Sequence, residues 1–360
     1  MSYQLPFAPI NLSVFPSTYA AARQNWLEHI NKLSGYHIAY PCAGVGPENE
    51  ALVTDTFWIG KKNAPRVLVL IAGTHGIEGF IGSAIQLDQL TLICSGQIVI
   101  PNNSAILLVH ALTPWGYAWQ RRCDADGVDL NRNNVDFSKP LPENKDYELI
   151  KDTLYLQDTK KTFAEFERLH GRIAFEKAIS TGQYCDPSGP FYGGKTPAHG
   201  RLVCEALISQ YNLQQRDLAV IDLHSGLGSY GYGEAICDHQ PDSAGTRVAH
   251  RWYGNSLALP LLGTSSSVPK TGLLDYAWHC IMNDRSCFIT LEFGTFSTDQ
   301  LFEILLHDHH LWAQNDNFSA RREHSKIMRH HFYPIDQAWK EMVIFRARQV
   351  IAQGLYGVSS

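Results

Sequence analysis

Two polar residues follow an apolar run near residue 70 of the chain. The stretch VLVLIAGTHGIEGFIGSA, residues 67–84, begins like a buried strand and then places His75 and Glu78 three positions apart among glycines. A His-x-x-Glu pair can bind a metal ion. Glycines also permit an ordinary strand-to-helix turn, in which both residues would be plain polar loop residues. The pair therefore predicts a metal site only if other parts of the chain supply further ligands.

Two more residues of the same chemistry end apolar runs elsewhere. His224 follows AVIDL, and Glu292 lies at the end of CFITLEF. Because ligands of open α/β sheets bind outside the carboxyl ends of the strands, we expect both side chains to meet His75 and Glu78 in one crevice. Two histidines and a carboxylate form a catalytic zinc set that leaves a position for water, and a second carboxylate can accept the water's proton. Taken singly, His224 could be a hydrogen-bonded core histidine and Glu292 a solvated or salt-bridged strand end.

A polar cluster adds groups that bind anions. The stretch AWQRRCDADGVDLNRNN contains Arg121, Arg122, Asn131 and Arg132. An arginine binds a carboxylate through two parallel hydrogen bonds, and an arginine beside a metal can polarise a carbonyl and stabilise the oxyanion. A solvated loop with structural arginine pairs, or a turn built on Asp and Asn, would also account for these residues.

The segments that must position these residues alternate between strand and helix. Apolar residues recur at helical spacing over residues 17–34, a β section follows, and residues 80–92 are again helical. Further apolar strands are predicted at 104–112, 218–223, 233–238, 259–264 and 286–295, with helices at 198–214 and 339–352. This alternation predicts an α/β fold in which helices cover a sheet.

The organisation of the chain indicates one elaborated domain over residues 1–360, because no Ser/Gly-rich linker divides it. Residues from about 134 to 197 are charged and mainly helical, and they end in the glycine-rich loop GQYCDPSGPFYGG. We interpret them as an insertion between two strands of the sheet. Such an insertion can form one rim of an active-site mouth, but a merely stabilising excursion is at least as common.

Composition excludes several classes of function. Hydrophobic residues make up 44% of the 360 and charged residues 18%, which is typical of a globular protein with a sizeable core. The net charge of −5 and the lack of a Lys/Arg block exclude nucleic acid and acidic membranes as expected partners. The apolar runs have only strand length, and no secretory signal is visible. Eight scattered cysteines are interpreted as mostly buried thiols in a reducing compartment, so we expect a cytoplasmic protein.

The order of these motifs resembles the zinc carboxypeptidase superfamily, which also contains the aspartoacylase and succinylglutamate desuccinylase deacylases. The stretches GTHGIEGFIGSAIQ, VDLNRN and GQYCDPSGPFYGG are more closely similar to a bacterial branch of it known only as a domain of unknown function. The resemblance covers about residues 67–295. It implies a three-layer αβα fold with a mixed, mostly parallel sheet of about eight strands.

The resemblance also implies roles for the metal-binding and basic residues. One zinc ion per chain would be held by His75, Glu78 and His224. Glu292 matches the general base of the superfamily.

For the cationic residues, Arg122 matches the arginine that polarises the carbonyl, with Arg121 as the fallback. Asn131 and Arg132 match the pair that anchors the terminal carboxylate of a carboxypeptidase substrate.

The chain also departs from the superfamily pattern. Carboxypeptidases carry a tyrosine before the segment that forms the specificity pocket, but GTSSSVPKTGLLDYAW has none in the matching place, and Tyr276 lies past the glycine. This difference argues against ordinary peptide carboxypeptidase activity. Lys270 could contact an anionic substrate or be a solvated loop lysine. Leu274 falls near the position that selects the substrate side chain, which predicts an apolar pocket.

The sequence therefore predicts a zinc-dependent, carboxypeptidase-like hydrolase of an amide bond, whose substrate bears a free carboxylate. The alternatives are an N-acyl-amino-acid deacylase and a non-catalytic binding module on the same fold. Ser83 and Ser225 lack the Gly-x-Ser-x-Gly elbow of a serine hydrolase, and GTHGIEG lacks dinucleotide-binding spacing. The histidines of HDHH, residues 307–310, and of RHH, residues 329–331, are interpreted as helix-surface residues. No pattern in the sequence indicates an oligomeric state.

Overall fold

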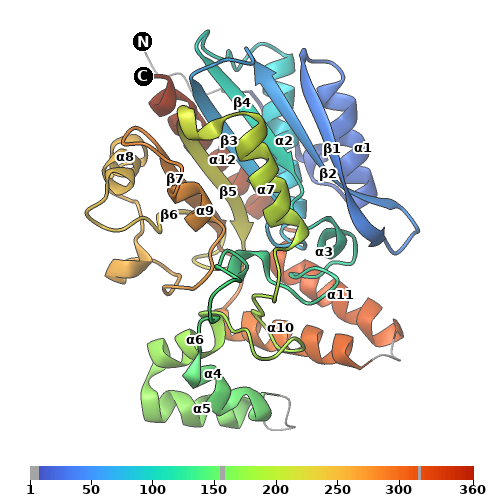
Figure 1. Cartoon of the computed structure of the whole chain (residues 1–360). Helices are drawn as coiled ribbons and strands as arrows, with labels where there is room; N and C mark the ends of the chain where they lie inside the picture. The colour runs from blue at the N-terminus through green and yellow to red at the C-terminus, as the bar shows by residue number, and fades with distance from the viewer. Residues whose placement is uncertain (1–7, 155–158, 315–317) are drawn as a thin grey trace.

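A twisted mixed sheet forms the centre of the molecule. The computed structural model describes residues 8–154, 159–314 and 318–360. Within these residues the sheet has seven strands in the order β1-β2-β4-β3-β5-β7-β6 (Figure 1). The strands are β1 (Gly35–Val45), β2 (Ala51–Gly60), β3 (Arg66–Ala72), β4 (Ser104–His110), β5 (Asp217–Ser225), β6 (Gly233–Ile236) and β7 (Cys287–Phe293). Strands β4, β3, β5 and β7 run parallel, β2 and β6 join the two sides of this group antiparallel, and β1 pairs antiparallel with β2.

The central strands are buried on both faces, which explains their continuous apolar sequences. In β3, Leu68 and Leu70 belong to one hydrophobic core, while Val67, Val69 and Ile71 belong to the other. Successive side chains of a strand point to opposite faces, so one strand contributes to both cores. The position of β3 at the middle of the sheet places its carboxyl end at the centre of the molecule.

Helices cover both faces of the sheet. The first core packs against α1 (Tyr19–Ile30), α2 (Gly79–Cys94), α8 (Ala244–Tyr253) and α12 (Gln337–Ser359). The second core packs against α7 (His199–Gln210) and the short α9 (Asp275–His279). These layers confirm the three-layer αβα fold with a mixed sheet that the sequence predicted, with seven strands rather than about eight.

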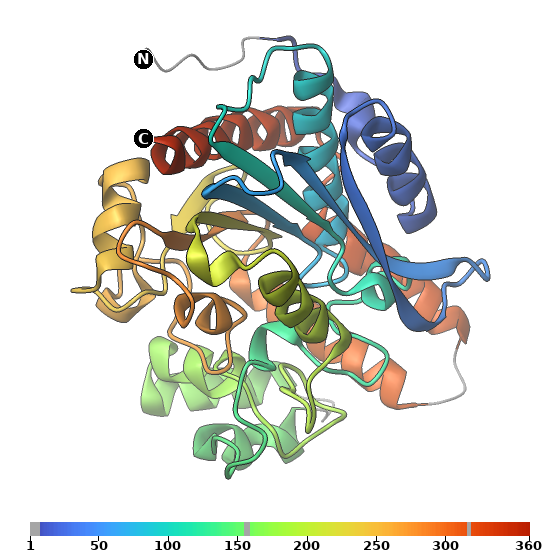
Figure 2. The same ribbon diagram turned by 45° about the horizontal axis from the view of Figure 1, so that its top comes forward.

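A further group of helices lies beyond the carboxyl ends of the parallel strands, below the sheet in Figures 1 and 2. It contains α4 (Lys145–Ile150), α5 (Thr159–His170) and α6 (Arg172–Ser180), together with α10 (Thr298–Ala313) and α11 (Phe318–Phe332). The rings of Phe175 in α6 and Phe302 in α10 lie 5.9 Å apart. The helical segment between about 134 and 197 is therefore packed against α10, near the ends of the strands. The short α3 (Pro114–Ala118) follows β4.

Three local predictions from the sequence need correction. Residues 259–264 are not a strand but contain a 3-10 turn at Pro260–Leu262, because proline starts the turn and Gly263 ends it with φ +68°. Among the histidines assigned to helix surfaces, His309 and His331 are buried, since they face the packed sides of α10 and α11. Four of the eight cysteines are buried, whereas Cys94, Cys185 and Cys280 are exposed. No helix in the described part of the chain is long and apolar enough to cross a membrane.

Candidate active site

The turn after β3 carries His75 and Glu78 and docks against the loop that carries Arg122. The N–H of Gly76 donates to the carbonyl of Arg122 at 2.9 Å. A β-carbon on Gly76 would lie 2.2 Å from the carbonyl carbon of Gly116, so a larger residue could not be accommodated there without movement of the backbone. Glycine at this position therefore lets two site-forming loops touch.

Strands β5 and β7 bring His224 and Glu292 to the same place. The two residues are direct partners in the parallel ladder, and β5 also pairs with β3 so that Leu223 lies opposite Ala72. The carboxyl ends of three neighbouring strands thus deliver the polar residues to one crevice, as the sequence predicted.

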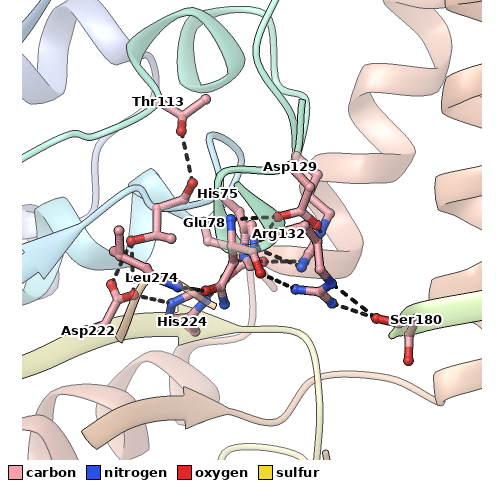
Figure 3. Close-up of polar contacts among 12 residues, drawn as sticks. His75, Glu78, Thr113, Asp129, Arg132, Ser180, Asp222, His224 and Leu274 are labelled. Atoms are coloured by element: carbon pink, nitrogen blue, oxygen red, sulfur yellow. Dashed lines mark hydrogen bonds and ion pairs between the residues drawn. The ribbon is translucent and has the colours of Figure 1, made fainter. Parts of the chain in front are cut away.

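The atoms of His75, Glu78 and His224 that could bind a metal converge (Figure 3). The Nδ1 atom of His75 lies 2.9 Å from Oε1 of Glu78, Nδ1 of His224 lies 2.9 Å from Oε2, and the two Nδ1 atoms are 3.2 Å apart. All three side chains are at least 97% buried. Two imidazole nitrogens and a carboxylate form a borderline donor set that fits zinc, so the residues present are suited to the ion that the sequence predicted.

A carboxylate stands behind each histidine. Nε2 of His224 lies 2.7 Å from Oδ2 of Asp222, and Nε2 of His75 lies 3.2 Å from Oδ1 of Asp129. Thr74 donates its hydroxyl to Asp222 at 2.8 Å. A carboxylate that accepts the Nε2 proton fixes the ring orientation and leaves the Nδ1 lone pair for a metal, as is common in metal centres.

Asp129 and Asp222 were not predicted as site residues, although the position of each in the sequence could have indicated it. Asp222 and His224 are two residues apart on a strand, which places them on the same face. Asp129 lies in the VDLNRN stretch, from which only Asn131 and Arg132 were predicted to belong to the site. A search for carboxylates two residues from a candidate ligand would have found Asp222.

Two adjacent arginines have different surroundings. Arg122 lines the cavity, where Nη1 donates to Glu78 Oε1 at 3.1 Å and Nε donates to Asp129 Oδ2 at 3.0 Å. Arg121 turns away from the cavity and donates to Asp308 of α10 at 2.7 Å. The structure therefore places Arg122, and not the fallback Arg121, beside His75 and Glu78.

Glu292 lines the cavity beside the ligand cluster. Its side chain is buried, and Oε1 accepts a hydrogen bond from the N–H of Leu227 at 3.0 Å. Burial and the neighbouring Glu78 raise the pKa of Glu292 to about 7. A carboxyl group that titrates near neutrality is suited to accept a proton and return it.

Only one of the two residues expected to anchor a substrate carboxylate lines the cavity. Asn131 lines the cavity and accepts the N–H of Leu274 at 2.8 Å. Arg132 is fully buried, and it donates to the carbonyls of Ser180 at 2.7 Å and Asn131 at 2.6 Å (Figure 3). Burial lowers the pKa of Arg132 to about 10. Its guanidinium thus faces backbone carbonyls rather than the cavity.

Lys270 lines the cavity, whereas Arg132 does not. Its Nζ donates to the carbonyl of Val268 at 2.8 Å and to the hydroxyl of Ser267. Burial, and then the charge of Arg132, lower the pKa of Lys270 to about 7. The hydroxyl of Tyr276 donates to the carbonyl of Lys270 at 2.9 Å, so this tyrosine supports the loop.

The residues near the expected specificity position are also not arranged as the sequence suggested. Leu274 is 1% exposed and packs in the second core, whereas its neighbours Leu273 and Asp275 line the cavity. This part of the wall is therefore not purely apolar. Further wall residues come from the helices below the sheet, namely Glu176 and Ser180 of α6 and Phe302 of α10.

The fold and the crevice at its strand ends define the class of protein as one with a zinc carboxypeptidase-like fold. Bovine thrombin-activatable fibrinolysis inhibitor, solved with a tick carboxypeptidase inhibitor, is similar with a TM-score of 0.51 and 10% identity, covering 95% of this chain and 97% of that one. Carboxypeptidase A from Helicoverpa armigera has a TM-score of 0.47 and 13% identity, covering 92% and 73%. An aspartoacylase family protein from Mesorhizobium loti has a TM-score of 0.39 and 15% identity, covering 84% and 68%.

At the level of sequence, the model of the family described as "Protein of unknown function (DUF2817)" matches residues 15–346. The chain belongs to this family. No curated relative matches the chain.

Proposed function

We propose that the chain is a zinc-dependent hydrolase of an amide bond in a small peptide or an N-acyl amino acid with a free carboxylate. The observation that supports this most is the convergence of two Nδ1 atoms and one carboxylate on a point that also borders Glu292 and the cavity. His75, Glu78 and His224 would hold the ion. When bound there, zinc supplies a Lewis acid that activates water and polarises a carbonyl.

Glu292 is proposed to act as the general base and then as the general acid. It takes a proton from the attacking water and returns it to the departing amine, and its pKa near 7 suits both steps. The hydrogen bond from Leu227 holds one carboxylate oxygen, which leaves the other for proton transfer.

Arg122 is proposed to stabilise the developing oxyanion. Its Nη2 lies 2.7 Å from Nε2 of His75, but a guanidinium only donates hydrogen bonds. Because coordination through Nδ1 keeps the proton of His75 on Nε2, this contact conflicts with the metal-bound form. We therefore expect Arg122 to turn from His75 toward a substrate carbonyl when metal is present, while the Nε2–H of His75 continues to donate to Asp129.

The substrate is proposed to be small, because side chains of α6 and α10 line the cavity and both helices lie beyond the carboxyl ends of the parallel strands (Figure 1). The substrate carboxylate would be held by Asn131 together with Lys270. Arg132 could take part only if its guanidinium left the carbonyls of Ser180 and Asn131. The same cavity would suit an N-acyl-amino-acid deacylase, so peptides and N-acyl amino acids belong in one assay panel.

Turnover by the zinc-loaded protein on such a panel tests the proposal. With a working substrate, Glu292→Gln should retain zinc and substrate binding but lower kcat by at least about 100-fold, because the proton acceptor is lost. Glu205→Gln, on the exposed side of α7, is the matched control and should keep full activity. Unchanged kcat in Glu292→Gln would contradict the assignment of the base.

A further inference from the structure

The cavity contains a second acidic region that the proposed hydrolysis does not use. Asp238 follows β6, Asp275 begins α9, and both line the same cavity as the metal-binding residues. Ile236, Phe288 and Thr290 line it as well, which places this region along β6 and β7. We call Asp238 and Asp275 the acidic pair.

Asp275 is a buried carboxylate with an unused oxygen. It is 4% exposed, and its Oδ1 has no hydrogen-bond partner among the described residues. Its Oδ2 lies 3.6 Å from Nε2 of His279, a distance too long for a hydrogen bond. Burying an ionised carboxylate without a partner is costly, so this group either stays protonated or meets a cation supplied from the cavity.

Asp238 is a second carboxylate that would favour a bound cation. Its side chain is half-buried, and in the part of the chain that the structure describes no lysine or arginine lies within 4.0 Å of either carboxylate of the acidic pair. Burial, and then the charge of Asp238, raise the pKa of Asp275 well above its ordinary value. Two neighbouring carboxylates therefore share a region with no resident counter-ion in contact.

Lys270 does not fill this role. Burial raises the pKa of Asp238 and the positive charge of Lys270 opposes this effect, but Nζ of Lys270 is held by the carbonyl of Val268 and the hydroxyl of Ser267. Arg132, which also acts on Asp238 electrostatically, donates to backbone carbonyls. Both resident cations are thus engaged elsewhere, and the acidic pair remains open to a group entering through the cavity.

We propose that Asp238 and Asp275 bind an ammonium or guanidinium group on the carboxyl-terminal residue of the substrate. This inference rests on the proposed function and names its substrate class: amides whose amine portion is a basic or diamino acid. An entering cation would satisfy the free Oδ1 of Asp275 through a charge-assisted hydrogen bond. An acidic side chain would be repelled, and an apolar one would leave both carboxylates unpaired.

The test compares matched substrates that differ only in the terminal charge. N-acyl amino acids and dipeptides ending in lysine, norleucine or glutamate are assayed with the zinc-loaded protein. We expect kcat/KM for lysine to exceed that for norleucine by at least about tenfold, since one charge-assisted hydrogen bond contributes that much or more. Asp238→Asn and Asp275→Asn should each reduce this ratio, and the double variant should bring it to about one. Asp242→Asn, an exposed change four residues from Asp238, should leave the ratio unchanged.

The ratio of two substrates on one preparation does not depend on the fraction of protein that is folded, so a destabilised Asp275→Asn still gives an answer. Norleucine substrates cleaved as fast as lysine substrates, or a lysine preference that survives in the double variant, would overturn the inference while leaving the hydrolase intact. A second equivalent of bound metal that is lost in the double variant would also overturn it, because the acidic pair would then hold a metal.

Calorimetric titration with free lysine and free norleucine separates the inference from the proposed function. Tighter binding of lysine that disappears in the double variant, in a protein that cleaves no substrate, would support the acidic pair and contradict the hydrolase. Equal binding of the two amino acids by the wild-type protein would contradict the acidic pair.

Discussion

The two ends of the cavity are built in different ways. Around the proposed metal-binding atoms the ligand side chains are hydrogen-bonded: Asp222 and Asp129 lie behind the two histidines, and Glu78 accepts from Arg122 and from the N–H of Ser225. At the acidic pair, Asp238 and Asp275 face the same cavity without a cation in contact. A preorganised network is suited to chemistry that is the same for every substrate, whereas an unfilled group is suited to recognition of one substrate feature.

The largest effect is predicted for substitutions of the adjacent residues Arg121 and Arg122. Arg122→Ala removes the donor proposed for the oxyanion and should lower kcat by about 100- to 1,000-fold with the metal retained. Arg121→Ala should instead lower the free energy of unfolding, because it leaves Asp308 of α10 buried without its partner, and should leave kcat within about threefold. Steady-state kinetics and thermal melts of both variants check this. Equal losses of kcat would show that the two arginines do not have separate roles.

The next largest effect is predicted for metal affinity, when a carboxylate behind a histidine is replaced. Asp222→Asn weakens the acceptor of the His224 Nε2 proton and should lower metal affinity by about 10- to 100-fold. Asp238→Asn, at the other end of the cavity, should leave metal affinity unchanged. Competition with a chromophoric chelator measures both affinities. A loss of similar size in Asp238→Asn would mean that the two ends are not independent.

Variants of Lys270 and Arg132 distinguish which of the two cations holds the substrate carboxylate. Lys270→Met should raise KM by about tenfold for carboxylate substrates but not for their amides, because Nζ borders the cavity. Arg132→Met should mainly lower the free energy of unfolding, by about 2 to 4 kcal/mol, since it leaves the Ser180 and Asn131 carbonyls unpaired. Urea unfolding and paired KM values distinguish the roles. A carboxylate-specific rise of KM in Arg132→Met alone would restore the carboxypeptidase-like anchor.

The smallest effect concerns an unpaired group that does not line the cavity. Nδ1 of His110 has no partner among the described residues, and burial lowers the pKa of His110 to about 4. A folded-state pKa below the unfolded value of 6.5 means that the unfolded chain binds the proton first as pH falls. Stability is therefore complete above pH 6.5 and declines toward pH 4, by about 1 kcal/mol between pH 7 and pH 5.5.

Unfolding free energies across this range for the wild-type protein, His110→Gln and the exposed His307→Gln test the point. His110→Gln should have a flatter pH dependence, and His307→Gln should retain the wild-type slope. An identical slope in all three would show that His110 does not contribute.

The sequence could predict residues that regular strands position, but not those whose direction depends on tertiary contacts. His75, His224 and Glu292 follow apolar strands, and parallel strands end at one edge, so their meeting could be anticipated. Arg132 was expected to face the substrate, but its direction is set by the Ser180 carbonyl at the end of α6, 48 residues away. No local pattern encodes that contact.

The three residues near the expected specificity position also could not be assigned from local sequence. Leu273, Leu274 and Asp275 are consecutive, and the start of α9 decides which of them face the cavity. Leu274 packs in the core and Asp275 lines the cavity, so an apolar pocket could not be distinguished from an acidic one before the packing of α9 was known.

The most direct test of the account is the metal content of the purified, zinc-equilibrated protein, measured by mass spectrometry after gel filtration. The account predicts about one zinc ion per chain in the wild-type protein and in Asp242→Asn, and a loss of nearly all bound zinc in the His75→Ala, His224→Ala double variant. A folded double variant that keeps one zinc ion per chain, or a wild-type protein that binds none, would contradict the metal centre on which the proposed function depends.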